Sequence, residues 1–237
     1  MGDWGQTSSS ELEKVLCLTL DQFLPYSQNL KKQKVRVLPA KEAPRVYYSE
    51  LTKAEYIIEL SARDRFWCQY VFQFAHEVGH LICGFKTQTH ANLWFEESLC
   101  EAASLFALQQ VSKQWKLSPP YPVWKNYFSE FFNYRRERMI NSSIPENFQL
   151  DSWLQQNRNT LTRSPDLRKQ NLWVAIKILP LLENSPLAAW SACEWLNSRN
   201  TQDLTFESYL SNWYDACPKQ NQKNFVLEVC NLFSIEI

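Results

Sequence analysis

The sequence has little glycine and histidine and no excess of charge of either sign. Four glycines and three histidines occur among 237 residues, whereas tryptophan occurs ten times. Acidic and basic residues balance at 25 each, so no overall field attracts nucleic acid or an anionic membrane. No apolar run approaches the roughly 18 residues that span a membrane. These absences predict an aromatic-rich protein with few flexible loops and an ample core, and neither nucleic acid nor a membrane is expected as a partner.

Cysteine is present, but not in the spacing of zinc fingers or disulfide frameworks. The seven cysteines are scattered, their number is odd, and no C-x-x-C pair exists. Residues 1–6 also lack the charged-then-apolar pattern of a signal peptide. We therefore expect free, mostly buried thiols in a cytoplasmic protein. Cys83 and Cys100 flank the motif described next, where a thiolate ligand is the alternative to simple packing.

The main chemical motif is residues 76–80, which read H-E-V-G-H and match the pattern H-E-x-x-H. Apolar residues on both sides predict a buried helix of about 20 residues that ends at Gly84. On a helix His76 and His80 share one face, and Glu77 lies about 100° away. Burying these groups without partners would cost several kcal/mol, and a divalent metal, usually zinc, removes that cost. The alternative is two core histidines satisfied by protein groups, with Glu77 in solvent.

A second predicted helix follows in the chain and places carboxylates near the histidines. It begins near Asn92, and Glu97 and Glu101 share one of its faces. Sixteen residues separate His80 from Glu97, enough to end one helix, turn and bring a carboxylate back. Periodicity alone leaves four candidates for a third metal ligand: Glu96, Glu97, Glu101 and His90.

Together the two segments resemble the gluzincin branch of zinc metallopeptidases, which includes thermolysin and related aminopeptidases. In that family the third ligand is a glutamate within a run such as W-[LF]-x-E-G-[LF]-A-E, and residues 94–101 here read W-F-E-E-S-L-C-E. Ser98 and Cys100 replace the Gly and the Ala of the family run, and both are small. The resemblance covers about 40 of the 237 residues. It implies Glu97 as the third ligand, with Glu101 hydrogen-bonding a ligand histidine.

Other assignments fit the sequence less well. Metzincins need a glycine and a third histidine at the positions that Cys83 and Lys86 occupy here. His90 is the one histidine outside the motif, and we expect it in a solvent-exposed loop, with contact to substrate as the alternative. No donor for an oxyanion stands out, and Tyr127, Tyr134 and His90 remain candidates.

The whole chain is expected to be α+β, with a small N-terminal sheet on the two metal-binding helices and a mainly helical C-terminal part. Residues 1–8 are expected to be disordered, and Ser9 or Ser10 to cap the first helix. Strands are predicted over 34–38, 45–48 and 55–60. Helices are predicted over 11–26, 123–140, 151–159, 166–182, 186–197, 205–217 and 223–233. The proline-rich run 118–122 then divides a zincin-like catalytic part, 1–117, from a helical part, 118–237.

These elements predict a zinc-dependent hydrolase that cleaves peptides or proteins. His76, His80 and Glu97 hold Zn2+, and Glu77 is the general base. Strand 55–60 is either an edge strand that pairs with extended substrate or an interior strand. The rival function is a catalytically inactive, zinc-stabilised scaffold or protein-interaction module.

Overall fold

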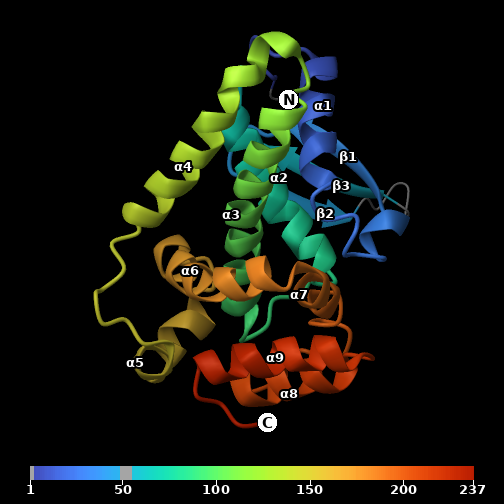
Figure 1. Cartoon of the computed structure of the whole chain (residues 1–237). Helices are drawn as coiled ribbons and strands as arrows, with labels where there is room; N and C mark the ends of the chain where they lie inside the picture. Colours follow the sequence, from blue (N-terminus) through green and yellow to red (C-terminus); the bar gives the residue numbers. More distant parts are fainter. Residues whose placement is uncertain (1–2, 49–54) are drawn as a thin grey trace. The chain divides into compact units, whose positions relative to one another are not determined.

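The computed structural model describes residues 3–48 and 55–237, and these residues form an α+β fold that is 60% helical (Figure 1). The strands are β1 Lys34–Pro39, β2 Arg45–Tyr48 and β3 Glu55–Leu60. The helices are α1 Ser9–Leu20, α2 Trp67–Ile82, α3 Leu93–Leu117, α4 Phe128–Ile140, α5 Leu150–Arg163, α6 Arg168–Asn184, α7 Pro186–Cys193, α8 Phe206–Ala216 and α9 Gln220–Leu232. Short 3-10 helices occupy Leu30–Lys32 and Pro122–Tyr127. None of the described helices is long and apolar enough to cross a membrane.

The chain divides into two compact units. One contains residues 1–79 and 103–138, and the other contains residues 80–102 and 139–237. The units differ from the predicted parts 1–117 and 118–237, because α2 and α3 each contribute residues to both units. The sequence signal for a boundary at 118–122 falls instead in the connection between α3 and α4, inside the first unit.

The sheet of the first unit has the order β1-β3-β2, so β3 is its central strand. β1 runs parallel to β3, and β2 runs antiparallel to it. The expectation that strand 55–60 pairs with substrate at an edge is therefore wrong, and the interior alternative is confirmed. Ile58 and Leu60 are fully buried, which suits a central strand, whereas the edge strands carry Lys34 and Arg45, as exposed edges commonly do.

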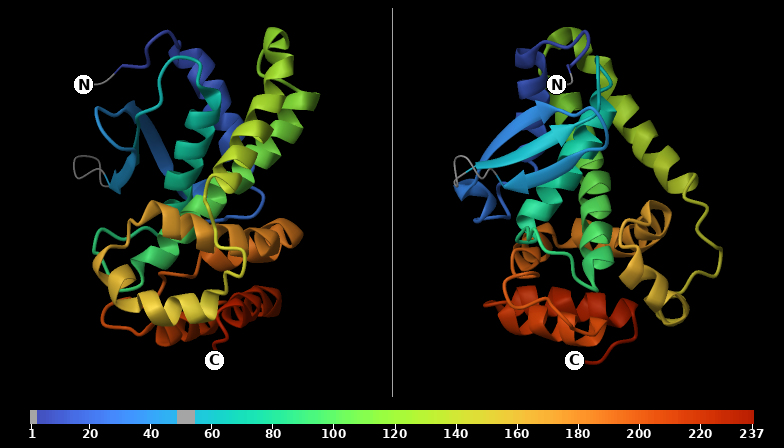
Figure 2. Two further views of the ribbon diagram at one scale, coloured as in Figure 1. Left: turned by 90° about the vertical axis from the view of Figure 1, so that its left-hand side faces the viewer. Right: turned by 180° about the vertical axis from the view of Figure 1, so that it is seen from behind.

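Helix α2 lies alongside this sheet in the views of Figures 1 and 2. The chain leaving β3 is tied to the helix by Gln73, whose Oε1 accepts hydrogen bonds from the backbone N–H groups of Ser61 and Ala62, both at 3.0 Å. Residues on every side of α2 are buried, among them Trp67 and Tyr70, which agrees with the predicted core helix. The H-E-x-x-H motif thus lies on a largely buried helix.

The N-terminal segment is ordered from residue 3 in the described part of the chain, although residues 1–8 were predicted to be disordered. Asp64 donates its backbone N–H to the Trp4 carbonyl at 2.9 Å, and its Oδ1 accepts from Gln6 N at 2.8 Å. The Trp4 ring also packs against Tyr70, with centroids 5.9 Å apart. These contacts are non-local, so a short polar stretch gave no sign of them. Residues 1–2 lie outside the described residues.

The first helix is capped by Ser8, one residue before the predicted candidates Ser9 and Ser10. Ser8 and Glu11 form a capping box, in which each side chain accepts from the backbone N–H of the other residue. The helix ends at Leu20, six residues before the predicted end at Tyr26.

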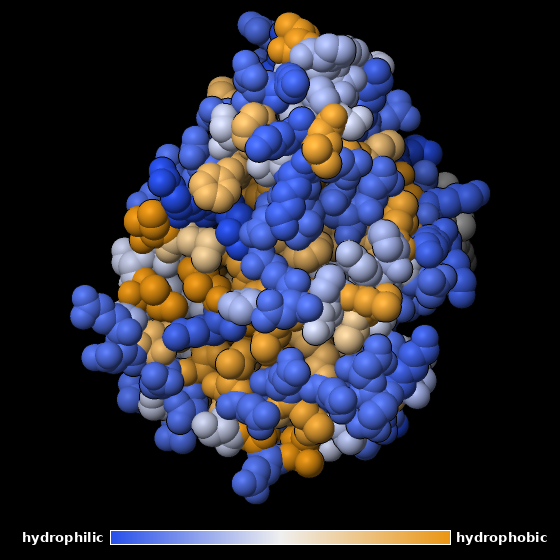
Figure 3. All heavy atoms as spheres, viewed as in Figure 1, coloured by the Kyte–Doolittle hydropathy of each residue, from blue (hydrophilic) through white to orange (hydrophobic). Residues whose placement is uncertain are grey.

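The second unit is helical, and an aromatic cluster fills its core around the start of α3. Trp94 packs on Phe206 with ring centroids 4.8 Å apart, and Phe95 packs on Phe233 at 6.0 Å. α8 and α9 lie side by side in the views of Figures 1 and 2. In Figure 3, apolar residues are exposed among hydrophilic ones around α6 and α9. The cluster fixes the rotation of α3 about its axis, and so decides where its glutamates point.

Candidate metal centre

The two motif histidines lie one turn apart on α2, as the helical spacing requires. A ring nitrogen of His76, a ring nitrogen of His80 and the Cys100 sulfur all lie within 4.8 Å of one another. Glu77 follows His76 on the same helix and is buried. The two histidines and Cys100 together form a group that could hold a metal ion.

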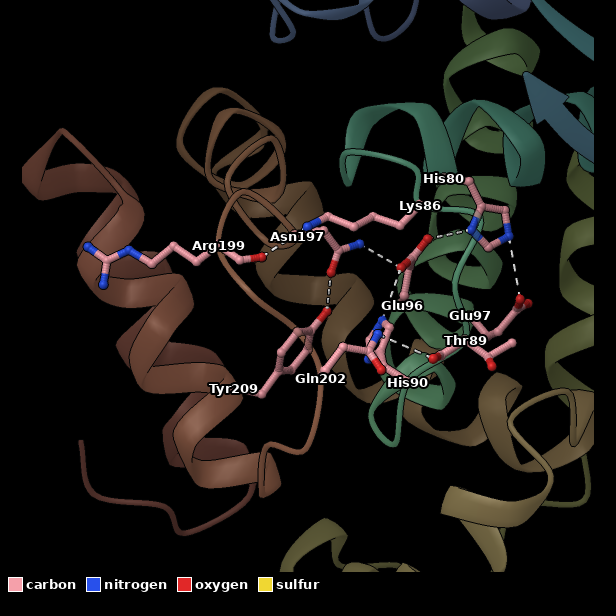
Figure 4. Close-up of polar contacts among 10 residues, drawn as sticks. All are labelled: His80, Lys86, Thr89, His90, Glu96, Glu97, Asn197, Arg199, Gln202 and Tyr209. Carbon is pink, nitrogen blue, oxygen red and sulfur yellow. Dashed lines mark hydrogen bonds and ion pairs between the residues drawn. The ribbon is translucent and has the colours of Figure 1, made fainter. Parts of the chain in front are cut away.

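The His80 ring lies between two carboxylates of α3, as Figure 4 shows. Its Nδ1 is 2.7 Å from Glu96 Oε1, and its Nε2 is 3.5 Å from Glu97 Oε1. An ionised carboxylate only accepts hydrogen bonds, so the short contact to Glu96 requires the proton on Nδ1. In the neutral ring Nε2 then carries the lone pair, and it lies 3.5 Å from Glu97 Oε1.

Glu96 is a buried carboxylate that stays ionised. Its side chain is 4% exposed, and its Oε2 accepts a hydrogen bond from Asn197 Nδ2 at 2.6 Å. Burial alone would raise its pKa, but the hydrogen bond from His80, the His90 ring 3.9 Å away and Asn197 together lower the pKa of Glu96 to about 2. The negative charge on Glu96 therefore persists at neutral pH and holds the His80 proton on Nδ1.

This geometry fits zinc. Bonds of about 2.0–2.1 Å in a tetrahedral site place two ligand atoms roughly 3.3–3.4 Å apart, close to the spacing of His80 Nε2 and Glu97 Oε1. A carboxylate behind the other ring nitrogen, as Glu96 is here, is the usual support of a zinc-binding histidine. The spacing of His80 Nε2 and Glu97 Oε1 is thus compatible with zinc between these two atoms.

One expectation from the sequence is wrong in the structure, and a second carboxylate joins another. His90 was expected in a solvent-exposed loop, but its side chain is buried, with its ring 5.4 Å from the Tyr209 ring. Glu101 was predicted to orient His76 or His80, and in the structure Glu96 also contacts His80. A contact between Glu101, which is buried one turn beyond Glu97, and a ligand histidine stays a prediction.

The sequence did not point to Asn197 or Tyr209, and it pointed to Glu96 only as a possible metal ligand. A local pattern indicated a role for Glu96. Two adjacent glutamates follow Trp94 and Phe95 in an apolar run, and only one of the two can be the ligand. Asn197 contacts Glu96 across 101 residues of chain. A separation of this size leaves no trace in local periodicity.

All seven cysteines are free, as predicted. Cys83, Cys100 and Cys193 are buried together, and the Cys83 thiol hydrogen-bonds with both of the others. Burial, with the neighbouring Cys83, raises the pKa of the Cys100 thiol well above its usual range. In the absence of a metal Cys100 is therefore a neutral thiol.

Comparison with known proteins identifies no relative of this chain: no family model, no curated protein and no solved structure matches it. Its function is therefore inferred from the residues of the site.

Proposed function

We propose that this chain is a zinc-dependent hydrolase of the gluzincin type, with a zincin-like catalytic part that cleaves peptide bonds. The observation that supports it best is the environment of His80. On an H-E-x-x-H helix, its Nδ1 is held by Glu96 at 2.7 Å while its Nε2 faces Glu97 at 3.5 Å. A core histidine satisfied only by packing has no need of a carboxylate at each nitrogen, whereas a zinc ligand uses both.

The residues divide the work of hydrolysis as follows. His76, His80 and Glu97 would hold zinc, which supplies a Lewis acid that polarises the scissile carbonyl and acidifies water. Glu77, buried on the same helix, accepts a proton as the water oxygen bonds to the carbonyl carbon. The C–N bond then breaks, and Glu77 returns the proton to the leaving amine. The products are a carboxylic acid and an amine.

The test is Glu77→Gln, because the amide keeps the size of the side chain but cannot accept the proton. We expect purified wild type to hold one zinc per chain and to cleave members of a peptide library. The variant should keep its zinc and cleave about 10²–10⁴-fold more slowly. Glu97→Ala is the control that should lose zinc instead. Equal cleavage by wild type and Glu77→Gln would overturn the assignment.

A second candidate, an inactive zinc-stabilised scaffold or interaction module, is favoured by one observation. The Cys100 sulfur lies within 4.8 Å of nitrogens of both histidines. If it joined His76, His80 and Glu97, four protein ligands would close the site, as in structural zinc centres. Cobalt(II) substitution separates the two functions. A sulfur-to-cobalt charge-transfer band that Cys100→Ser removes would favour the scaffold, and its absence would favour the hydrolase.

Peptides or proteins are the proposed substrates, because balanced charge favours neither nucleic acid nor an anionic surface. A cytoplasmic location belongs to the same proposal. It is supported by the seven free cysteines, which a reducing compartment would maintain.

A further inference from the structure

We propose that Asn197 and Tyr209 are positioning residues for the metal centre and act on it through Glu96. This role rests on the zinc site of the proposed function, but not on hydrolysis. Three hydrogen bonds form a continuous chain, drawn in Figure 4. Tyr209 O–H donates to Asn197 Oδ1 at 2.7 Å, Asn197 Nδ2 donates to Glu96 Oε2 at 2.6 Å, and Glu96 Oε1 accepts from His80 Nδ1 at 2.7 Å.

The direction of each bond in this chain fixes the next. Because Tyr209 donates to the Asn197 oxygen, the amide nitrogen of Asn197 must face Glu96. That nitrogen can only donate, so it holds an acceptor in place, and the carboxylate oxygen Oε2 of Glu96 lies 2.6 Å from it. Glu96 Oε1 in turn contacts His80 Nδ1, so Nε2 is the ring nitrogen that lies toward Glu97. Tyr209 on α8 thus helps to hold the Glu96 carboxylate in position beside His80.

Burial makes each link costly to break. Asn197 is 2% exposed and Tyr209 is 1% exposed, so water does not replace a lost partner. A buried polar group left without its partner costs about 1–3 kcal/mol. The chain of bonds therefore has one favourable arrangement in the second unit.

The backbone around Asn197 is held in register with the connection between α2 and α3. Asn197 donates its backbone N–H to the Cys83 carbonyl at 3.3 Å. Three side-chain bonds continue the pairing of the segments 83–92 and 197–204: Lys86 Nζ to Arg199 O at 3.0 Å, Gln202 Nε2 to Thr89 O at 3.4 Å, and Asn92 Nδ2 to Leu204 O at 3.0 Å. The segment that carries Asn197 is thus fixed against the chain that joins His80 to Glu96.

The experiment measures zinc affinity by competition with a chromophoric chelator, using the full chain. Asn197→Asp sets a second carboxylate against Glu96, and we expect zinc affinity to fall about 10–100-fold, as when a partner behind a ligand histidine is lost. Tyr209→Phe removes one hydroxyl and frees the Asn197 amide to turn, and we expect a fall of up to about tenfold. This milder variant tests the role even if Asn197→Asp does not fold.

Matched controls separate positioning from general destabilisation. Asn171 is also 2% exposed and donates from Nδ2, but to the Pro165 carbonyl at 2.7 Å in the same unit. Tyr214 lies on α8, as Tyr209 does. Asn171→Asp and Tyr214→Phe should bind zinc within twofold of wild type.

A double-mutant cycle tests whether Asn197 acts through Glu96. In a Glu96→Gln background, Asn197→Asp should lower zinc affinity much less than in wild type, because the link is already broken. Equal effects in the two backgrounds, or losses in the controls as large as in Asn197→Asp, would overturn the positioning role and leave the hydrolase standing. Wild type that binds zinc with the predicted variant effects, but cleaves no peptide, would support the positioning role while refuting hydrolysis. Wild type without zinc would refute both.

Discussion

Replacing Glu96 by glutamine should move a proton between the two nitrogens of His80. Gln has the size of Glu but offers one oxygen and one NH2 group. Asn197 Nδ2 donates at 2.6 Å and its Oδ1 accepts from Tyr209, so we expect the Gln oxygen to face Asn197. The NH2 group then faces His80 Nδ1, which must give up its proton and accept. The proton moves to Nε2, the nitrogen that faces Glu97.

Glu96→Gln should weaken zinc binding more than it lowers the stability of the fold. Without metal the variant keeps a hydrogen bond between residue 96 and His80 with donor and acceptor exchanged, so stability changes little. Zinc at Nε2 forces the proton back to Nδ1, where it meets the NH2 group and one buried hydrogen bond is lost. That loss is about 1–3 kcal/mol, and since 1.4 kcal/mol is a factor of ten, affinity should fall about 5–150-fold.

Competition with a chelator at neutral pH measures the zinc affinity of wild type and Glu96→Gln. Glu207→Gln is the control, because this substitution also neutralises a carboxylate in the second unit. Nitrogen-15 NMR of the metal-free chain should show the His80 proton on Nδ1 in wild type and on Nε2 in Glu96→Gln. A variant that binds zinc within twofold of wild type, or that keeps the proton on Nδ1, would refute this reasoning.

Two further predictions concern stability. Gly84 has φ +78°, and a Cβ there would be 3.8 Å from its nearest neighbour, in ordinary contact, so Gly84→Ala should cost about 1–2 kcal/mol in urea unfolding through backbone strain alone. An unchanged midpoint would mean that the turn relaxes. Glu207 forms two hydrogen bonds with Arg158, which lower its pKa from 4.5 to about 2. A lowered pKa stabilises the fold above pH 4.5, and this contribution is lost as the pH falls toward 2. Because the Glu207 side chain is 41% exposed, Glu207→Gln should cost at most about 1 kcal/mol at pH 7 and nothing near pH 2. A cost that does not vary with pH would contradict the ion pair.

Local patterns in the sequence were enough to place most of the elements. The alternating strands and the apolar motif helix are encoded by neighbouring residues, and the structure has them within a few residues of the predicted bounds. Strand order was not predictable in this way. β3 is central because of pairings with β1 and β2, and the decision between edge and interior depends on chain segments that a local pattern does not include.

The candidate site, too, could be predicted from local patterns only in part. The facing of His76 and His80 follows from helical periodicity alone. Which glutamate of α3 meets which nitrogen of His80 depends on the rotation of that helix, and the contact of Trp94 with Phe206 sets this rotation from a distant segment. Periodicity therefore listed Glu96 among the candidate ligands without showing that it contacts Nδ1.

Because 101 residues separate Glu96 from Asn197, the two residues are synthesised at different times. The ribosome completes the motif helix and the start of α3 well before it reaches residue 197. Until then the nascent chain has His76, His80 and Glu97, but lacks the amide that orients Glu96 and the segment that pairs with residues 83–92. Under the proposed positioning role, such a chain would bind zinc only loosely, and tight binding would require Asn197 and Tyr209. In the cell the metal centre would thus mature late, and a chain released early would be a poor zinc binder despite containing every proposed ligand.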